Sequence, residues 1–182
     1  MSRNGNIGER VAEFTLPDLD GRSSSLEDTI AGRRGAVVVF WSGVCSHCRR
    51  YDAYLNDFAA RHDELALVVV ASRQSESAGE LRRTAAERGL RFAILHDTDR
   101  RVAHAWQVEQ TPRVFLVDES GKLLYRGAID NFKYPNDPEH EPYLEPAIAD
   151  YLAGRPITRA ETPSFGCAIE AVYYQLPKPL GS

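Results

Sequence analysis

Two cysteines separated by two residues, Cys45 and Cys48, constrain this chain more than any other feature. A continuous apolar run over 36–41 precedes them and predicts a buried strand. After them, apolar side chains recur at steps of three and four residues, which predicts one amphipathic helix over 46–62. At such a strand-to-helix junction, free backbone N–H groups and the positive end of the helix dipole favour a thiolate at Cys45. This spacing predicts a reversible dithiol/disulfide pair.

The composition excludes several other classes of protein. The chain has 182 residues with 43% hydrophobic content, enough for one well-cored domain. Its formal net charge of −4 argues against nucleic-acid binding, because domains that neutralise phosphates are usually basic. The longest apolar runs are strand-sized, far short of the ~20 residues of a membrane helix, so we expect no membrane span. Three cysteines are too few for a disulfide scaffold, whereas one pair and one spare suit redox chemistry.

The first ten residues contain no apolar segment of the kind found in secretory signals. On the sequence as given we expect a cytoplasmic protein, and a periplasmic one is the alternative if a leader was removed. We expect a monomer without cofactor or metal. Its expected partners are protein or small-molecule thiols and disulfides and one redox partner of unidentified nature.

Strands and helices alternate along the chain, which predicts an α/β fold with a mixed central sheet and helices on both faces. An N-terminal hairpin over 7–20 turns at Asp20–Gly21 and precedes one helical turn capped by Ser24 or Ser25. The remaining predicted elements are strands over 65–71, 92–95, 113–118 and 123–126, helices over 76–88, from 97 or 98 to 106 and over 143–152, and a loop over 131–142.

We therefore predict one domain over 1–153, in which 7–35 is an N-terminal hairpin extension. Residues 154–182 are predicted to form a C-terminal arm or tail, packed around Cys167 and the apolar stretch 168–174.

Several short stretches carry a resemblance to a known superfamily. They are Gly8 with Phe14–Gly21, Phe40–Trp41 with Cys45-Ser46-His47-Cys48, Asp97–Arg100, Thr111–Asp118 and Gly121–Lys122. In these stretches the chain resembles the thioredoxin superfamily, in particular the redoxin branch that includes tethered or exported thiol-disulfide oxidoreductases and the peroxiredoxins. The resemblance implies a thioredoxin-like fold and a redox-active cysteine pair.

The resemblance also implies that the Thr111–Pro112 peptide bond is cis and lies beside the two sulfurs. A proline holds the cis form at a cost of only about 1 kcal/mol. The backbone of Thr111 then faces an incoming peptide, which can pair with it like an added strand. The alternative is that Pro112 merely opens the strand over 113–118, where proline is tolerated.

Position within the motif suggests a role for each residue. Cys45 comes first, so we expect it to be the more exposed sulfur and the nucleophile, with Cys48 as the resolving thiol that frees the partner. His47 lies between them and would stabilise the Cys45 thiolate, which makes the pair more oxidising. A solvated histidine without such a role is the alternative.

Glu76 and Cys167 are further candidates. In tethered members of the branch an acid just after the next strand accepts a proton, and Glu76 occupies that place; alternatively it begins the helix over 76–88 as a favourable charge. Cys167 lies in a Gly-Cys-x-Ile sequence similar to the C-terminal part of some bacterial redoxin proteins. It is either a third redox thiol that exchanges with Cys45 or Cys48, or a small buried residue that anchors the arm.

The leading functional prediction is a thiol-disulfide oxidoreductase. The second is a thiol peroxidase. When the peroxiredoxin pattern is placed on Cys45 or on Cys48 it specifies four preceding positions, and only Ser42 has the expected residue type. The third is a non-enzymatic copper- or zinc-handling protein that uses Cys45, Cys48 and His47 or Cys167, since thiolates suit Cu(I).

Overall fold

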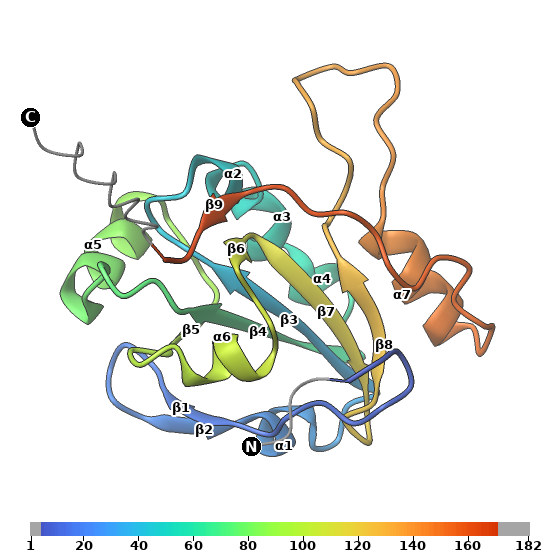
Figure 1. Cartoon of the computed structure of the whole chain (residues 1–182), viewed down its shortest axis with the longest axis horizontal. Helices are drawn as coiled ribbons and strands as arrows, with labels where there is room; N and C mark the ends of the chain where they lie inside the picture. The colour runs from blue at the N-terminus through green and yellow to red at the C-terminus, as the bar shows by residue number, and fades with distance from the viewer. Residues whose placement is uncertain (1–4, 171–182) are drawn as a thin grey trace, which may run out of the picture.

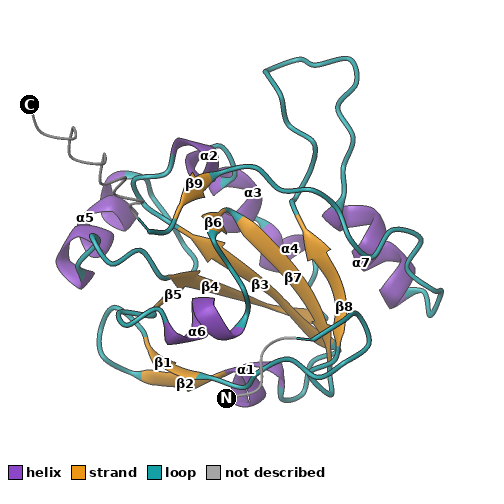
Figure 2. Cartoon of the chain, viewed as in Figure 1, coloured by secondary structure: helices purple, strands orange, loops and turns teal. Residues whose placement is uncertain are grey.

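A central five-stranded sheet organises the fold in the computed structural model, which describes residues 5–170 (Figures 1 and 2). Neighbouring strands β3, β4 and β5 are parallel, and β7 and β8 run antiparallel to their neighbours. This mixed sheet confirms the predicted fold class. In spatial order its strands are β5 (Ile94–His96), β4 (Leu65–Ala71), β3 (Gly35–Trp41), β7 (Arg113–Asp118) and β8 (Leu123–Gly127).

Strand β3 lies in the middle of the sheet and is buried along its whole length. Val38 and Phe40 contribute to one hydrophobic cluster, whereas Val37, Val39 and Trp41 contribute to another. Side chains alternate across a strand, so each cluster lies on one face of the sheet. An uninterrupted apolar run in the sequence is what a strand covered on both faces requires.

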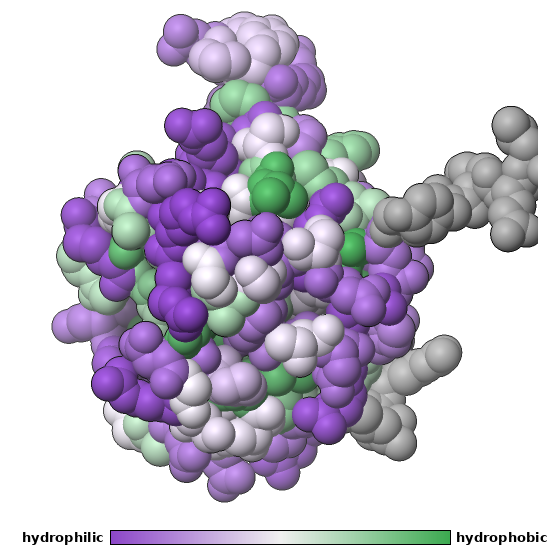
Figure 3. Space-filling model, turned by 90° about the vertical axis from the view of Figure 1, so that its left-hand side faces the viewer, coloured by the Kyte–Doolittle hydropathy of each residue, from purple (hydrophilic) through white to green (hydrophobic). Residues whose placement is uncertain are grey.

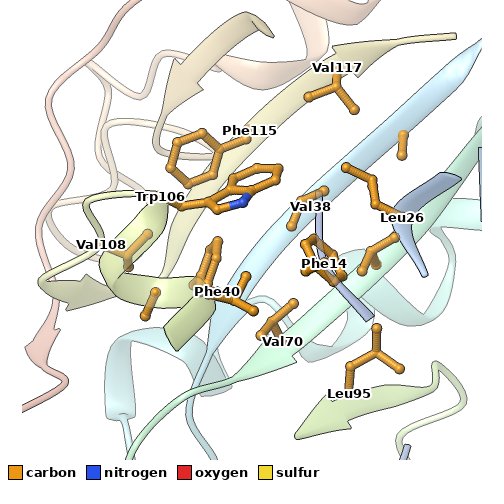
Figure 4. Packing of buried hydrophobic residues seen from close by; sticks show 14 of the residues in the cluster. Phe14, Leu26, Val38, Phe40, Val70, Leu95, Trp106, Val108, Phe115 and Val117 are labelled. Atoms are coloured by element: carbon orange, nitrogen blue, oxygen red, sulfur yellow. The ribbon is translucent and has the colours of Figure 1, made fainter. Parts of the chain in front are cut away.

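An aromatic cluster fills the first face (Figure 4). The ring of Trp106 lies 5.8 Å from Phe14, 5.8 Å from Phe40 and 5.0 Å from Phe115, measured between centroids. Its indole N–H donates to the carbonyl of Ala12 (3.0 Å), which satisfies its polar atom. The elements over this face are β1 (Thr15–Pro17), β2 (Ser23–Ser25), α1 (Leu26–Ile30) and α6 (Arg101–Ala105).

The other face is covered by the remaining helices. They supply buried residues such as Phe58, Leu81 and Ile148, which pack against β3, β4 and β7. These helices are α2 (Ser46–Arg49), α3 (Asp52–Asn56), α4 (Phe58–Arg61), α5 (Ala78–Glu87) and α7 (Leu144–Leu152).

The single helix predicted over 46–62 is wrong, because three short helices occupy this stretch. The N–H of Tyr51 donates to Cys48 and that of Ala60 to Asp57, each three residues back, so the regular four-residue ladder is broken at both places. The apolar spacing continues across these breaks, and for that reason the sequence pattern did not reveal them.

The starts of two other helices also differ from the prediction. Helix α5 begins at Ala78, where Ser77 and Glu80 form a capping box, so Glu76 precedes the helix instead of starting it. Before α6 the N-cap residue is Arg100, but the carboxylate of Asp97 accepts the backbone N–H groups of residues 102 and 103. The short strand predicted over 92–95 lies at Ile94–His96.

The N-terminal hairpin is present but lies later than predicted. Its strands β1 and β2 pair antiparallel through a turn over 18–22, and residues 7–14 are not part of either strand. The side chain of Ser25 accepts from the N–H of Asp28 (3.0 Å) and caps α1, as expected. The loop over 131–142 is also confirmed and projects from the body between β8 and α7 (Figure 1).

The C-terminal arm returns to the sheet after α7 and crosses its end (Figure 1). Its strand β9 (Cys167–Ala168) pairs antiparallel with β6 (Gln110–Thr111). The predicted packing of the stretch 168–174 falls partly outside the described residues. Within residues 5–170, no helix is long and apolar enough to cross a bilayer. On the face in Figure 3 the surface is mostly hydrophilic, with small separate apolar areas.

Replacing Phe115 with alanine tests the aromatic cluster. The ring is 2% exposed, so its removal should leave a cavity and lower the free energy of unfolding by about 3–5 kcal/mol. Urea unfolding measures the change. The matched control is Tyr134→Ala, in the projecting loop, where the side chain is 54% exposed and the change should stay within about 0.5 kcal/mol. Equal effects of both substitutions would contradict this description of the core.

Candidate active site

The cysteine pair lies just beyond the end of β3. The strand ends at Trp41, and Cys45 is the N-cap residue of α2. The N–H groups of Cys48 and Arg49 both donate to the carbonyl of Cys45 (3.1 and 3.2 Å), so one tight turn carries the pair. The predicted strand-to-helix junction is therefore confirmed.

Both cysteines are buried, Cys45 with 1% of its surface exposed and Cys48 with none. The order agrees with the expectation that Cys45 is the more exposed, but Cys45 is nearly as buried as Cys48 in this conformation. The C-terminal arm is the reason, because pairing of β9 with β6 sets Cys167 opposite Thr111, next to the motif. All three cysteines are free thiols.

Hydrogen bonds lower the pKa of the Cys45 thiol to about 4. The largest contribution comes from the thiol of Cys48, burial opposes it, and the thiol of Cys167 and the backbone of Cys48 and Cys167 add to it. Burial raises the pKa of Cys48, and its contact with Cys45 raises it further. The same two causes raise the pKa of Cys167. Cys45 therefore carries the charge, and the other two thiols keep their protons and donate to it.

The peptide bond between Thr111 and Pro112 is cis, as the resemblance implied. The Sγ atom of Cys45 lies 3.3 Å from the carbonyl oxygen of Thr111, to which the protonated thiol donates. Cys45 thus has a partner in either protonation state. The motif and the proline turn, 66 residues apart in the sequence, meet at this contact.

Glu76 lies beneath the loop that leads into the motif. It is 5% exposed, and its carboxylate accepts from the hydroxyl of Ser42 (2.6 Å) and the N–H of Val44 (3.2 Å). A Cβ atom on Gly43 would lie 2.8 Å from this carboxylate, so the fit is close. The backbone of Ser42 in turn hydrogen-bonds Cys48. Glu76 therefore reaches the buried thiol through one intervening residue.

His47 is half-buried, and its ring makes no hydrogen bond with any described residue. Its backbone, with that of Ser46, faces the sulfur of Cys167 instead. Its influence on the redox potential therefore stays a prediction.

Arg88 is a contributor that sequence reasoning missed. It donates to the carbonyl of Gly43 (2.8 Å), pairs with Asp52 (2.5 Å) and lies 5.2 Å from the centre of the Trp41 ring. It thereby braces the loop before the motif from the end of α5. No spacing signal connects residues 43 and 88, since only the packing of α5 against the loop brings them together.

Residues 5–170 contain no group of three or more His, Cys, Asp or Glu side chains arranged to hold a metal ion. The copper- or zinc-handling alternative therefore gains no support from this part of the chain.

A cysteine pair at the end of a central strand, faced by a cis-proline turn, defines a thioredoxin-like protein. Residues 7–126 match the AhpC/TSA family. The chain belongs to the AhpC/TSA family.

Named relatives and solved structures agree with this assignment. The thiol-disulfide oxidoreductase ResA of Geobacillus thermodenitrificans is 29% identical over 117 residues, which cover 64% of this chain and 66% of that protein. An uncharacterized conserved protein from Geobacillus kaustophilus superposes with a TM-score of 0.80 at 26% identity, over 92% of this chain and 93% of its own. The thioredoxin domain of a Bacteroides vulgatus thiol-disulfide oxidoreductase gives a TM-score of 0.57 at 24% identity, over 68% and 89%. The chain thus spans about two thirds of the length of the curated relative.

Titration of the reduced protein tests the charge on Cys45. Thiolate absorbance near 240 nm should appear with a midpoint far below that of an ordinary thiol, because the Cys48 thiol stabilises the anion. Ionisation of Cys45 also contributes to the stability of the reduced fold. This contribution is fully present above the pKa of an ordinary thiol and is lost as the pH falls toward 4. Cys48→Ala should raise the midpoint more than Cys167→Ala does. An unshifted midpoint in the wild-type protein would refute the assignment.

Proposed function

We propose that this protein is a thiol-disulfide oxidoreductase in which Cys45 attacks and Cys48 resolves. The observation that carries the proposal is the contact between the sulfur of Cys45 and the buried thiol of Cys48 beside the Thr111 carbonyl, an arrangement that lowers the pKa of Cys45. A thiolate is the attacking form of cysteine, and a neutral neighbour stabilises it without competing as a nucleophile. The relative named thiol-disulfide oxidoreductase supports the same assignment.

The proposed reaction has two steps. The Cys45 thiolate attacks a substrate disulfide, forms a mixed disulfide and releases one substrate thiolate. Cys48 then loses its proton and attacks the sulfur of Cys45, which releases the second substrate thiol and leaves the Cys45–Cys48 disulfide. Two electrons pass to the substrate, and the reverse sequence oxidises a dithiol.

The second step needs a proton acceptor, because burial keeps Cys48 protonated. We assign this role to Glu76, which is separated from the thiol by one residue, Ser42. The 2.6 Å bond from Ser42 to the carboxylate and the bond from the backbone of Ser42 to Cys48 support the assignment.

Thr111 and Pro112 are proposed to position the substrate. Their turn lies beside the sulfur of Cys45, and Thr111 already pairs with an extended segment, β9. A peptide that carries a disulfide can pair in the same way, so we propose protein disulfides as the principal substrate class.

The thiol peroxidase alternative has less support. The one residue that fits the peroxiredoxin pattern is Ser42, and its hydroxyl donates to Glu76. It is therefore not directed at a peroxide beside Cys45.

Single substitutions at the two cysteines should separate the two steps. Cys45→Ser should lower disulfide reductase activity roughly a thousandfold or more, because the nucleophile is lost. Cys48→Ser, made together with Cys167→Ala so that no other thiol can resolve the adduct, should still attack but accumulate a mixed disulfide with the substrate, visible on non-reducing gels and by mass spectrometry. If Cys48→Ser trapped no adduct while Cys45→Ser did, the two roles would be reversed.

Glu76→Gln tests the proton acceptor. Rapid-mixing kinetics should show a normal rate of mixed-disulfide formation but a resolution step slowed roughly a hundredfold near neutral pH, with less loss at alkaline pH. The control is Glu87→Gln, at the exposed end of α5. Equal slowing of both steps would indicate that Glu76 only shapes the loop at 42–44.

A further inference from the structure

The place proposed for a substrate peptide is occupied by residues 163–170 of the same chain, here called the strap. Within it, β9 pairs antiparallel with β6, and Cys167 is the partner of Thr111 (Figure 1). A strap residue thus makes the pairing that an incoming peptide would make. The strap also covers the nucleophile, since Cys45 is only 1% exposed.

The strap fits its place closely. A Cβ atom on Gly166 would lie 1.8 Å from the carbonyl oxygen of Thr111 and 3.1 Å from the nitrogen of Pro112. The strap therefore approaches the turn more closely than any residue with a side chain allows. Glycine directly before Cys167 is a condition for this approach.

Contacts on both sides of Cys167 hold the strap. Ser164 accepts from the side chains of Gln110 (2.5 Å to its carbonyl) and Arg113 (2.6 Å to its hydroxyl). On the other side, Arg73 donates to the carbonyl of Ala168 (3.0 Å). The N–H of residue 169 donates to the carbonyl of residue 109 (2.9 Å). Pairing of two residues on each strand, with side-chain anchors at each end, is the arrangement of a bound peptide.

The strap brings a third sulfur to the reacting atom. Both the thiol and the backbone of Cys167 hydrogen-bond the sulfur of Cys45. Cys167 itself is half-exposed, unlike the two buried cysteines of the motif. A thiol in contact with the attacking sulfur, on a strand that pairs with the cis-proline turn, has the placement of a substrate cysteine.

We propose that the strap is an internal substrate: Cys167 exchanges with Cys45, and external peptides bind only when the strap leaves the turn. This proposal rests on the proposed function of the cysteine pair. In the Cys45–Cys48 disulfide state, Cys167 gives its proton to water and attacks the sulfur of Cys45. The Cys45–Cys167 bond forms, the Cys45–Cys48 bond breaks, and Cys48 leaves as a thiolate that takes up a proton. One disulfide replaces another, so the step consumes no oxidant or reductant.

The strap therefore determines which disulfides the site accepts. An external peptide competes with a tethered one, whose effective concentration reaches the millimolar range for short linkers. A disulfide without flanking backbone cannot replace the pairing to Gln110 and Thr111. The site should consequently favour extended peptides over small-molecule disulfides.

Oxidised glutathione tests the exchange in a Cys48→Ala variant. Cys45 attacks the disulfide of oxidised glutathione and releases one glutathione. Cys167 then attacks the sulfur of Cys45 in this adduct and releases the second glutathione. Mass spectrometry of an acid-quenched, non-reduced digest should show the peptide with Cys45 linked to the peptide with Cys167. The control is Cys48→Ala with Cys167→Ala, which should stop at the glutathione adduct.

The outcomes separate the two proposals. A persistent glutathione adduct in both variants would overturn the exchange at Cys167 and leave the proposed function intact. Absence of any adduct in both, even when Gly166→Val is added to displace the strap and when the thiols react normally after denaturation, would show that Cys45 is not the nucleophile and would overturn both proposals.

Displacing the strap tests its control of access. In Gly166→Val the new side chain collides with the turn, so alkylation of Cys45 by iodoacetamide should accelerate by roughly tenfold or more, the change that corresponds to about 1.4 kcal/mol. The control is Gly79→Ala in α5, where a Cβ has its nearest neighbour at 4.0 Å and the rate should stay at the wild-type value. Circular dichroism checks folding.

If Gly166→Val does not fold, Arg73→Ala provides the same readout, since it removes the bond to the strap at Ala168. A wild-type alkylation rate in a folded strap variant would show that the strap does not restrict access to Cys45.

Discussion

The sulfur of Cys45 is the point on which the site depends. It receives hydrogen bonds from the thiols of Cys48 and Cys167 and lies against the carbonyl of Thr111. A charge in so buried a place is stable only if donors replace the water it has lost. One donor, Cys48, comes from the motif itself and the other, Cys167, from the C-terminal arm, which is remote in the sequence, so the chemistry of the pair depends on the whole fold.

The fold holds these segments in fixed positions. Strand β3 is buried on both faces and delivers the motif at its end, while β7 delivers the proline turn from the neighbouring position in the sheet. Beneath the loop between β3 and α2, Glu76 and Arg88 bind its hydroxyl and backbone groups. The rigid sheet and these polar contacts together place the reacting atoms before any substrate arrives.

The C-terminal arm lies against the cysteine pair and brings a third thiol, Cys167, to the site. The family match ends at residue 126, and the arm lies beyond it. The likeness to the Geobacillus kaustophilus structure covers 92% of this chain, so it extends well past the family match. In our proposal, access to the dithiol is controlled by a part of the chain outside the residues that match the family.

The sequence by itself was enough for the fold class and the cysteine pair, and its resemblance to a known superfamily was enough for the cis-proline turn. Apolar runs such as 36–41 and the residues at fixed spacing around Cys45 depend on local chemistry, which a sequence displays directly. The sequence did not reveal the breaks between α2, α3 and α4, the contacts of Arg88 with the loop before the motif, or the burial of Cys45. They arise from contacts between residues tens of positions apart, and only the tertiary structure decides which of these residues meet.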